Sequence, residues 1–333
     1  MSGIVAKVIR NERVESLHRG HIAVVDSEGK LLAAFGDVNL QTYIRSAAKP
    51  IQIMPLLKDS AHQHFGFSDK ELAVMMASHN GEKFHIKTVA SILEKIGLTA
   101  EHFKCGFHLP MHQPSANKHL RQNEAQSPIY NNCSGKHAGM LALAQFHNWP
   151  VATYLEPQHP VQKRIKEMMA LFSGLNETEI GVGVDGCSAP VFFLPIINMA
   201  CMYAKLAEGR ILPSRQVFDL MSSNPEMIAG SGRFDSVLMR VMRGRMISKV
   251  GAEGIRCLAV RGNQPLGIAL KIEDGSKRAS DVVLLAVLEQ LELISQKERD
   301  ALSEFRNPTI VNWAGIQTGR ICAEFELSKS LHA

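Results

Sequence analysis

Ser46 and Lys49 stand three residues apart in the segment RSAAKP at residues 45–50. Side chains at positions i and i+3 lie on the same face of a helical turn, so a neutral Lys49 amine could take the proton of the Ser46 hydroxyl. A serine hydroxyl is a good nucleophile only when an adjacent base accepts its proton, and Ser-x-x-Lys is one form of that pairing. The same spacing occurs twice elsewhere in the chain. The segment therefore predicts either an acyl-transfer nucleophile or an ordinary helix start.

A second reactive segment lies at residues 131–140, where Cys133, Lys136 and His137 bring together a thiol, an amine and an imidazole. We expect a helix to begin here, and the exposed amides of a helix N-terminus favour anions and lower the pKa of a nearby thiol. The segment could bind a carboxylate, activate Cys133 or hold a metal ion. The alternative is a glycine-bearing loop with a buried free cysteine. A phosphate-binding P-loop is excluded because no Ser or Thr follows the lysine.

Two further segments carry polar groups in a pattern that suits a site. Asp185 and Cys187 follow a predicted strand, where sheet proteins often bind ligands, and Asp185 could bind a substrate ammonium. Cys133 and Cys187 could share a zinc ion, although two sulfurs are fewer than the four ligands of a usual structural site. Ser78 begins the run SHNGE at residues 78–82, which also fits a capped helix junction.

The elements that must position these residues include both strands and helices. Two apolar runs around a glycine-containing turn predict a β-hairpin at residues 21–35, before the Ser46 segment. Pro50 suits the first turn of a helix over residues 51–57, and a capping box at residues 68–71 predicts a short helix that ends near Ser78. Residues 105–132 are rich in Pro, His, Asn and Gln and predict a long irregular connection.

The apolar pattern continues to the end of the chain. It predicts further helices at about residues 82–97, 138–146, 161–172, 191–206, 217–221 and 280–295, and strands at residues 180–185, 257–260 and 266–272. Together these elements predict an α/β sandwich with a helical lobe.

Composition limits the class of protein. The 333 residues are 45% hydrophobic and can bury a large core, as one domain or two lobes. There is neither an apolar run of ~20 residues nor an apolar signal core near residue 1, which predicts a cytoplasmic enzyme without a membrane partner. The net charge of +5 comes from dispersed residues, so we expect no nucleic-acid partner. Six cysteines without a secretion signal should be reduced.

Taken together, six motifs resemble the rhizobial-type L-asparaginase family. They lie at residues 15–20, 45–50, 77–82, 133–140, 185–187 and 249–254, and the match runs from near residue 9 to about residue 320. The resemblance implies hydrolysis of L-asparagine to L-aspartate and ammonia by a single domain over residues 1–333. It also implies a homodimer and a fold similar to serine β-lactamases and penicillin-binding proteins, an antiparallel sheet with helices plus a helical lobe.

The resemblance implies particular roles for residues of this chain. It pairs Ser46 with Lys49, and Ser78 with a lysine on a C-terminal strand, for which Lys271 is the best match. The same resemblance implies zinc as cofactor and a pocket for the small substrate. The zinc ligands are Cys133, Lys136 and Cys187, and the pocket residues are Arg45, His137 and Asp185. A lysine ligand must lose its proton, which two thiolates and Zn²⁺ nearby could favour.

Several alternatives stay open at this point. The sequence does not decide whether Ser46 or Ser78 is the nucleophile. Another serine acyl-transfer enzyme on the same scaffold, a zinc-responsive binding protein without enzymatic activity, and hydrolysis by zinc-activated water also fit parts of the pattern. Ser188 departs from the family, which often has glycine after the second cysteine.

Overall fold

The computed structural model describes residues 2–329, and the chain divides into two compact units. We call residues 1–47, 194–208 and 237–333 the sheet unit, and residues 48–193 and 209–236 the helical unit. The single domain predicted over residues 1–333 stays a prediction, since two compact units can belong to one domain. Within residues 2–329, no helix is long and apolar enough to cross a membrane.

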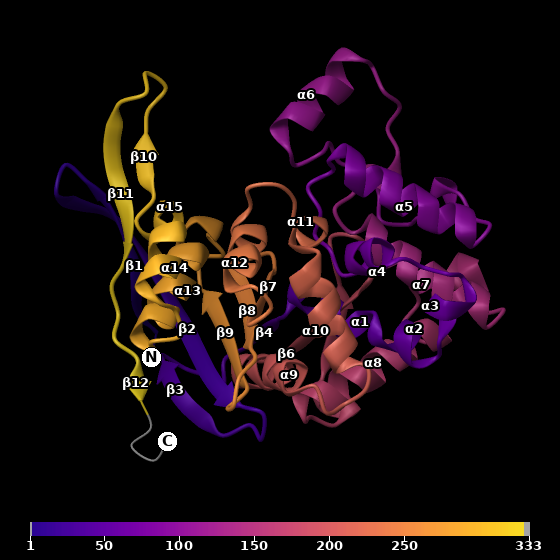
Figure 1. Cartoon of the computed structure of the whole chain (residues 1–333), viewed down its shortest axis with the longest axis horizontal. Helices are drawn as coiled ribbons and strands as arrows, with labels where there is room; N and C mark the ends of the chain where they lie inside the picture. The colour runs from indigo at the N-terminus through magenta and orange to yellow at the C-terminus, as the bar shows by residue number, and fades with distance from the viewer. Residues whose placement is uncertain (1, 330–333) are drawn as a thin grey trace. The chain divides into compact units, whose positions relative to one another are not determined.

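The sheet unit is built on a mostly continuous antiparallel sheet. The strands of this sheet are β1 (Gly3–Arg10), β2 (Arg13–Asp26), β3 (Leu31–Phe35), β7 (Met246–Val250), β8 (Ile255–Val260), β9 (Leu266–Ile272), β10 (Thr309–Val311), β11 (Gln317–Ala323) and β12 (Ser328–Lys329). The short strand β4 (Gln41–Tyr43) lies outside it. The order across the sheet is β10-β11-β1-β2-β9-β8-β7, with β3 beside β2 and β12 beside β3. β1 therefore lies next to β11, so that indigo and yellow strands are neighbours in Figure 1.

Helices cover this sheet. Its helices are α9 (Ile196–Glu208), α13 (Lys277–Gln290), α14 (Gln296–Ala301) and α15 (Ser303–Arg306). β7 and β8 are buried at every position, as expected for strands covered on both faces. α9 packs on β2, β8 and β9, and α13 packs on β1, β9 and β11. Gly267 permits the close approach of α9, because a Cβ there would lie 1.9 Å from the carbonyl oxygen of Ala200.

The helical unit contains most of the remaining helices. Its elements are α1 (Lys49–Gln52), α2 (Met54–Lys58), α3 (Ala61–His64), α4 (Asp69–Met75), α5 (Lys83–Lys95), α6 (Gln113–Arg121), α7 (Ser134–Phe146), α8 (Pro160–Ser173), α10 (Ser214–Ser223), α11 (Pro225–Ile228), the 3₁₀ helices η2 (Ala100–His102), η3 (Pro128–Tyr130), η4 (Val151–Thr153) and η5 (Glu177–Glu179), and strand β5 (Gly181–Val184). η1 (Arg45–Ala48), β6 (Pro190–Pro195) and α12 (Phe234–Met242) each have residues in both units.

Helix α7 forms the core of the helical unit. It is buried from Ser134 to Ala144 and packs against α2, α3, α4, α5 and α8. Gly135 and Gly139 lie one turn apart on the face toward α4, and a Cβ on Gly135 would lie 2.0 Å from the carbonyl oxygen of Val74. These two glycines let the backbones of α4 and α7 approach closely.

The predicted elements are largely confirmed. β2 and β3 form the predicted hairpin, the capping box at Ser68 and Glu71 begins α4, and β8 and β9 are adjacent strands. Mixed α/β structure with an antiparallel sheet is likewise confirmed. The likeness to serine β-lactamases stays a prediction.

Three element predictions were wrong. Residues 191–206 are not one helix, because the Val-Phe-Phe-Leu run that starts at Val191 favours the strand β6 and α9 begins only at Ile196. The strand expected to be buried at residues 180–185 is β5, which is mostly exposed, with Val184 82% exposed. The connection at residues 105–132 contains α6, whose early Pro114 suits a first helical turn.

Candidate active site

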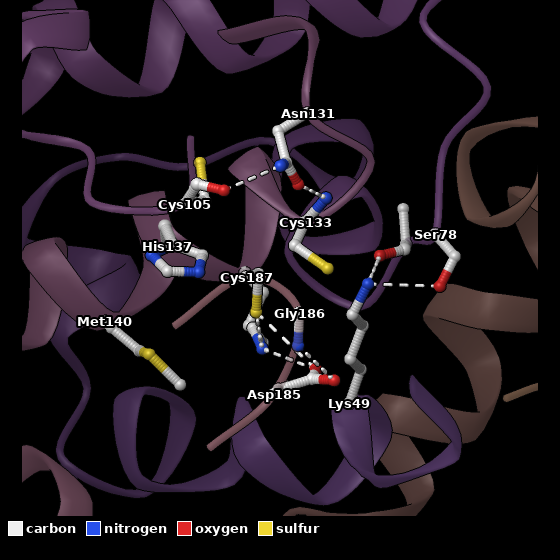
Figure 2. A network of polar contacts seen from close by, with 12 residues as sticks. Lys49, Ser78, Cys105, Asn131, Cys133, His137, Met140, Asp185, Gly186 and Cys187 are labelled. Carbon is white, nitrogen blue, oxygen red and sulfur yellow. Dashed lines mark hydrogen bonds and ion pairs between the residues drawn. The ribbon is translucent and has the colours of Figure 1, made fainter. Parts of the chain in front are cut away.

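A buried lysine reaches the hydroxyl of Ser78. Lys49 is the first residue of α1 and is only 1% exposed. Its Nζ donates hydrogen bonds to the carbonyl oxygen of Ala77 at 2.6 Å and to Ser78 Oγ at 3.0 Å (Figure 2). A buried amine without such bonds would be costly, so these two contacts fix the position of the side chain. The sequence predicted Lys49 as a partner of Ser46, and the structure shows it beside Ser78.

The segment that carries Ser78 is held by a neighbouring loop. The backbone N–H of Ser78 donates to the carbonyl oxygen of Ile228 at 2.9 Å, and Glu82 Oε2 accepts a hydrogen bond from the backbone N–H of Ser231 at 2.9 Å. Gly230 has φ +117°, and a Cβ there would lie 2.2 Å from Asn80. Sequence reasoning missed this loop. The only local signal was the pair of glycines on either side of Ser231.

Ser46 lies in η1, which runs directly into α1. The helical turn that the Ser-x-x-Lys spacing requires is therefore present. Arg45, directly before Ser46, has φ +53°. The left-handed conformation costs a non-glycine residue about 1–2 kcal/mol, and such strain tends to occur at functional sites. The boundary between the two units falls between Ala47 and Ala48, so Ser46 and Lys49 belong to different units. Their pairing therefore stays a prediction.

The predicted metal ligands converge in the core of the helical unit. Cys133 is the N-cap of α7, and Cys187 follows β5. Lys136 Nζ donates a hydrogen bond to Cys187 Sγ at 3.0 Å and lies 3.9 Å from Asp185 Oδ2. Cys187 Sγ in turn lies 3.5 Å from the same carboxylate oxygen (Figure 2). Two sulfurs, an amine and a carboxylate are thus brought together.

The pKa values of Cys133, Cys187 and Lys136 are shifted in different directions. A hydrogen bond from Cys187 lowers the pKa of Cys133 well below its usual value, and the ammonium groups of Lys49 and Lys136 also favour the thiolate. The same hydrogen bond and burial raise the pKa of Cys187. Burial opposes the charge on Lys136, but the nearby sulfurs and Asp185 outweigh it and raise its pKa. Cys133 is therefore the sulfur that loses its proton more readily.

The donor set fits a zinc ion. Within residues 2–329, no group of three or more His, Cys, Asp and Glu side chains is arranged to hold a metal. The three predicted ligands, Cys133, Lys136 and Cys187, include an amine and therefore do not belong to that class. Thiolate and nitrogen donors suit zinc, and three protein ligands leave a fourth position free. Lys136 would have to release its proton on binding.

Asn131 fixes the start of α7. Its Oδ1 accepts a hydrogen bond from the backbone N–H of Cys133 at 2.9 Å, and its Nδ2 donates to the carbonyl oxygens of Cys105 at 2.8 Å and Gly106 at 3.2 Å. The side chain is 5% exposed. Sequence reasoning missed this role, since residues 105–132 looked like an irregular connection. The available signal was an asparagine two residues before Cys133, at the predicted start of a helix.

Two predicted substrate residues lie in the same core. His137 is completely buried, and burial together with the charges of Lys136 and Lys49 lowers its pKa well below the usual value. Asp185 Oδ1 accepts the backbone N–H of Gly186 at 2.9 Å, and the Asp185 carbonyl oxygen accepts that of Ser188 at 2.8 Å. This is a tight turn. Arg45, the third predicted substrate residue, lies in the sheet unit.

Ser188 occupies a position that suits glycine. Its φ is +67°, in the left-handed region that side chains disfavour. The departure from the family at this residue therefore concerns backbone conformation and leaves the groups of Asp185 and Cys187 in place.

Lys271 lies on β9 of the sheet unit. Its Nζ donates a hydrogen bond to the carbonyl oxygen of Glu253, and burial lowers its pKa. Lys249, on β7, is completely buried and donates to the carbonyl oxygen of Val250 at 2.9 Å. The pairing of Ser78 with Lys271 joins residues of different units and stays a prediction. Sequence reasoning did not single out Lys249 as a site residue, although the motif at residues 249–254 begins with it.

Known proteins were compared with this chain. Two solved structures that resemble it are those described as Mglu in its native form (17% identity over 85% of this chain and 67% of that one, TM-score 0.48) and a Bacillus glutaminase (13% identity over 82% and 91%, TM-score 0.36). Similarity at this level does not establish a common fold. No curated protein matches the sequence. The model of the family described as L-asparaginase II, however, matches residues 6–323, so this chain belongs to the L-asparaginase II family.

Proposed function

We propose that this amidohydrolase is an L-asparaginase of the rhizobial type, which hydrolyses L-asparagine to L-aspartate and ammonia through an acyl-enzyme. The observation that most supports the proposal is the hydrogen bond from the buried Lys49 amine to Ser78 Oγ, in a chain of the L-asparaginase II family. A lysine and a serine held together in a water-poor core can exchange a proton, which activates an alcohol for attack on an amide.

Ser46 is the proposed nucleophile. The tetrahedral intermediate needs an N–H donor for its oxyanion, and the N–H of the nucleophile itself often serves. The N–H of Ser78 already donates to Ile228. Ser46 lies in the first turn of η1, where N–H groups have no partner within the helix. Its own N–H is therefore a suitable oxyanion donor, which favours Ser46 over Ser78.

Lys49 is the proposed base. To act as a base, the ammonium form of Lys49 must first release a proton, and the neutral amine then has two N–H groups and one lone pair. The two N–H groups satisfy the carbonyl oxygen of Ala77 and Ser78 Oγ, which leaves the lone pair for the proton of Ser46. Ser46 Oγ then bonds to the side-chain carbonyl carbon of asparagine, and the C–N bond breaks as the nitrogen takes from Lys49 the proton that came from Ser46 and leaves as ammonia. Water attacks the resulting ester, releases L-aspartate and restores the serine.

Other residues bind the substrate. In the proposal Arg45 pairs with the α-carboxylate, Asp185 pairs with the ammonium, and His137 lines the pocket. Lys271 acts as the partner of Ser78. A zinc ion bound by Cys133, Lys136 and Cys187 would supply a fixed positive charge that attracts a substrate oxygen.

The remaining parts of the proposal follow the rhizobial-type resemblance. They are a serine β-lactamase-like fold, a homodimer and a cytoplasmic location. Sedimentation of the purified protein would test the dimer independently of any activity.

Ammonia release from L-asparagine tests the function directly. Ser46→Ala should lower the rate at least about 1,000-fold, as loss of a nucleophile does, and Ser78→Ala should lower it less. Ser115→Ala is the matched control, because Ser115 belongs to a second Ser-x-x-Lys match and its Oγ pairs with His112 at 2.9 Å. Full activity of a variant that lacks the hydroxyls of both Ser46 and Ser78 would refute the serine mechanism. Ammonia release from L-glutamine but not from L-asparagine would show that the proposed substrate is wrong.

A further inference from the structure

His137 has one nitrogen with a partner and one without. Its Nδ1 lies 2.6 Å from the phenol oxygen of Tyr154, and both side chains are completely buried. Its Nε2 is also buried and has no hydrogen-bond partner in the part of the chain that the structure describes. A buried polar atom of this kind is uncommon in native proteins and calls for an explanation.

The hydrogen bonds of the Tyr154 phenol favour one position for the proton of the His137 ring. The backbone N–H of Lys104 donates to the phenol oxygen at 3.1 Å, so this oxygen is already an acceptor. The phenol has one proton of its own. His137 Nδ1 is the acceptor within reach of that proton, and an Nδ1 that accepts cannot carry hydrogen in the neutral ring. This arrangement favours the neutral imidazole with its proton on Nε2.

The ring is also held in place by its neighbours. Phe103 and Tyr154 contact it edge to face, with ring centroids at 6.5 Å and 5.6 Å. The ring lies in the same cluster as Cys187 and Cys105 (Figure 2). The Nε2–H group is therefore a hydrogen-bond donor with a fixed direction in the core that holds the candidate active site.

We propose that Tyr154 is a positioning residue, which fixes His137 as the Nε2–H tautomer so that this group donates a hydrogen bond to a carbonyl or carboxylate oxygen of the substrate. This step rests on the proposed function for the identity of the substrate. It makes His137 a donor and leaves the role of base to Lys49. An ammonium group has no lone pair, so this position selects an oxygen of the substrate.

The tautomer is measured without any substrate. Long-range ¹H–¹⁵N correlation spectra of histidine-labelled protein distinguish a protonated from an unprotonated ring nitrogen, and His137→Gln identifies the signal. We expect Nε2 to carry the proton in the native protein and Tyr154→Phe to mix the two tautomers. Tyr130→Phe is the control, since the Tyr130 hydroxyl bonds to Glu124 at 2.7 Å, away from His137. A proton on Nδ1 in the native protein would overturn the proposal even if the enzyme is active.

Kinetics test whether the donor meets the substrate. Tyr154→Phe should raise KM for L-asparagine about tenfold with little change in kcat, which is the effect of losing one oriented hydrogen bond to the bound substrate. In a His137→Gln background the same change should have no further effect on KM. An equal effect of Tyr154→Phe in both backgrounds would show a general structural role and refute the proposal. Absence of asparaginase activity would instead refute the proposed function, while the spectra still decide the tautomer.

Discussion

Buried lysines occur in both units, but their hydrogen-bond partners differ. In the helical unit, Lys49 and Lys136 reach side chains that can exchange protons, the hydroxyl of Ser78 and the sulfur of Cys187. In the sheet unit, one hydrogen bond of Lys249 goes to the carbonyl oxygen of Val250, and Lys271 donates to that of Glu253. A carbonyl oxygen accepts a hydrogen bond but does not exchange a proton at neutral pH.

A buried amine can have a structural role or a role in proton transfer, depending on its hydrogen-bond partner. A lysine beside a carbonyl oxygen offsets its desolvation and stabilises a turn or a strand end. A lysine beside a hydroxyl or a thiol can also move a proton, because small changes in the environment alter which group holds it. Lys49 and Lys136 are therefore lysines with a partner that can exchange a proton.

Replacing the lysines one at a time is the strongest test of whether they differ in their contribution to catalysis. Lys49→Met should lower asparagine hydrolysis by about 100-fold to 10,000-fold, because it removes a general base. Lys249→Met and Lys271→Met should each lower it less. The measurement is kcat/KM for each variant, together with thermal unfolding to confirm that each variant is folded.

The ranking of the three lysines decides the outcome. A larger loss in Lys271→Met than in Lys49→Met would move the base to the sheet unit. Lys95→Met is a control in the helical unit, since Lys95 is partly exposed and pairs with Glu71 at 2.7 Å. It should leave the rate unchanged.

Cysteines allow the same comparison for metal binding. Cys133 and Cys187 lie beside an amine and a carboxylate, whereas Cys257 on β8 is completely buried in the sheet. Cys133→Ser and Cys187→Ser should each weaken zinc binding by more than the roughly 10–100-fold that loss of an outer partner of a metal site costs. Cys257→Ser should leave it unchanged. Equilibrium dialysis against zinc followed by metal analysis measures both.

Two results would contradict this expectation. Zinc that stays bound without either Cys133 or Cys187 would show a different metal site. Loss of zinc in Cys257→Ser with native thermal unfolding would link metal binding to the sheet.

Local sequence patterns predicted much of the fold. The capping box of α4, the hairpin of β2 and β3, and the adjacent strands β8 and β9 depend on neighbouring residues, and periodicity or turn chemistry reveals them. The boundary between β6 and α9 was missed because a buried strand and a buried helix are both continuously apolar.

The candidate site was predictable only in its residue types. Motifs indicated Lys49, Ser78, Lys136 and Cys187, but not the hydrogen bond between Lys49 and Ser78. That contact joins α1 to the segment after α4, 29 residues further along the chain, and such long-range packing leaves no local pattern. Tyr154 was missed for the same reason, since it meets His137 only in the folded unit.

Three buried histidines, His85, His18 and His21, differ in their partners. In the helical unit, His85 Nε2 lies 2.9 Å from the carbonyl oxygen of Glu226, and its Nδ1 is buried without a partner among the described residues. In the sheet unit, His18 lies 2.7 Å from Asp274 and His21 lies 2.8 Å from Glu273, both carboxylates. A charged ring has a compensating partner in the second case only.

The smallest expected effect is on acid stability. Burial lowers the pKa of His85 from 6.5 to about 4, so the unfolded chain binds a proton more readily than the folded one between these values. The contribution of His85 is present above about pH 6.5 and is lost as the pH falls toward 4. Between about pH 7.5 and about pH 5, His85→Gln should lose about 2 kcal/mol less stability than the native protein in urea unfolding. His85→Leu should show the same reduction, because neither side chain can be protonated, and an unchanged pH dependence in both would show that His85 is not responsible for acid sensitivity in the helical unit.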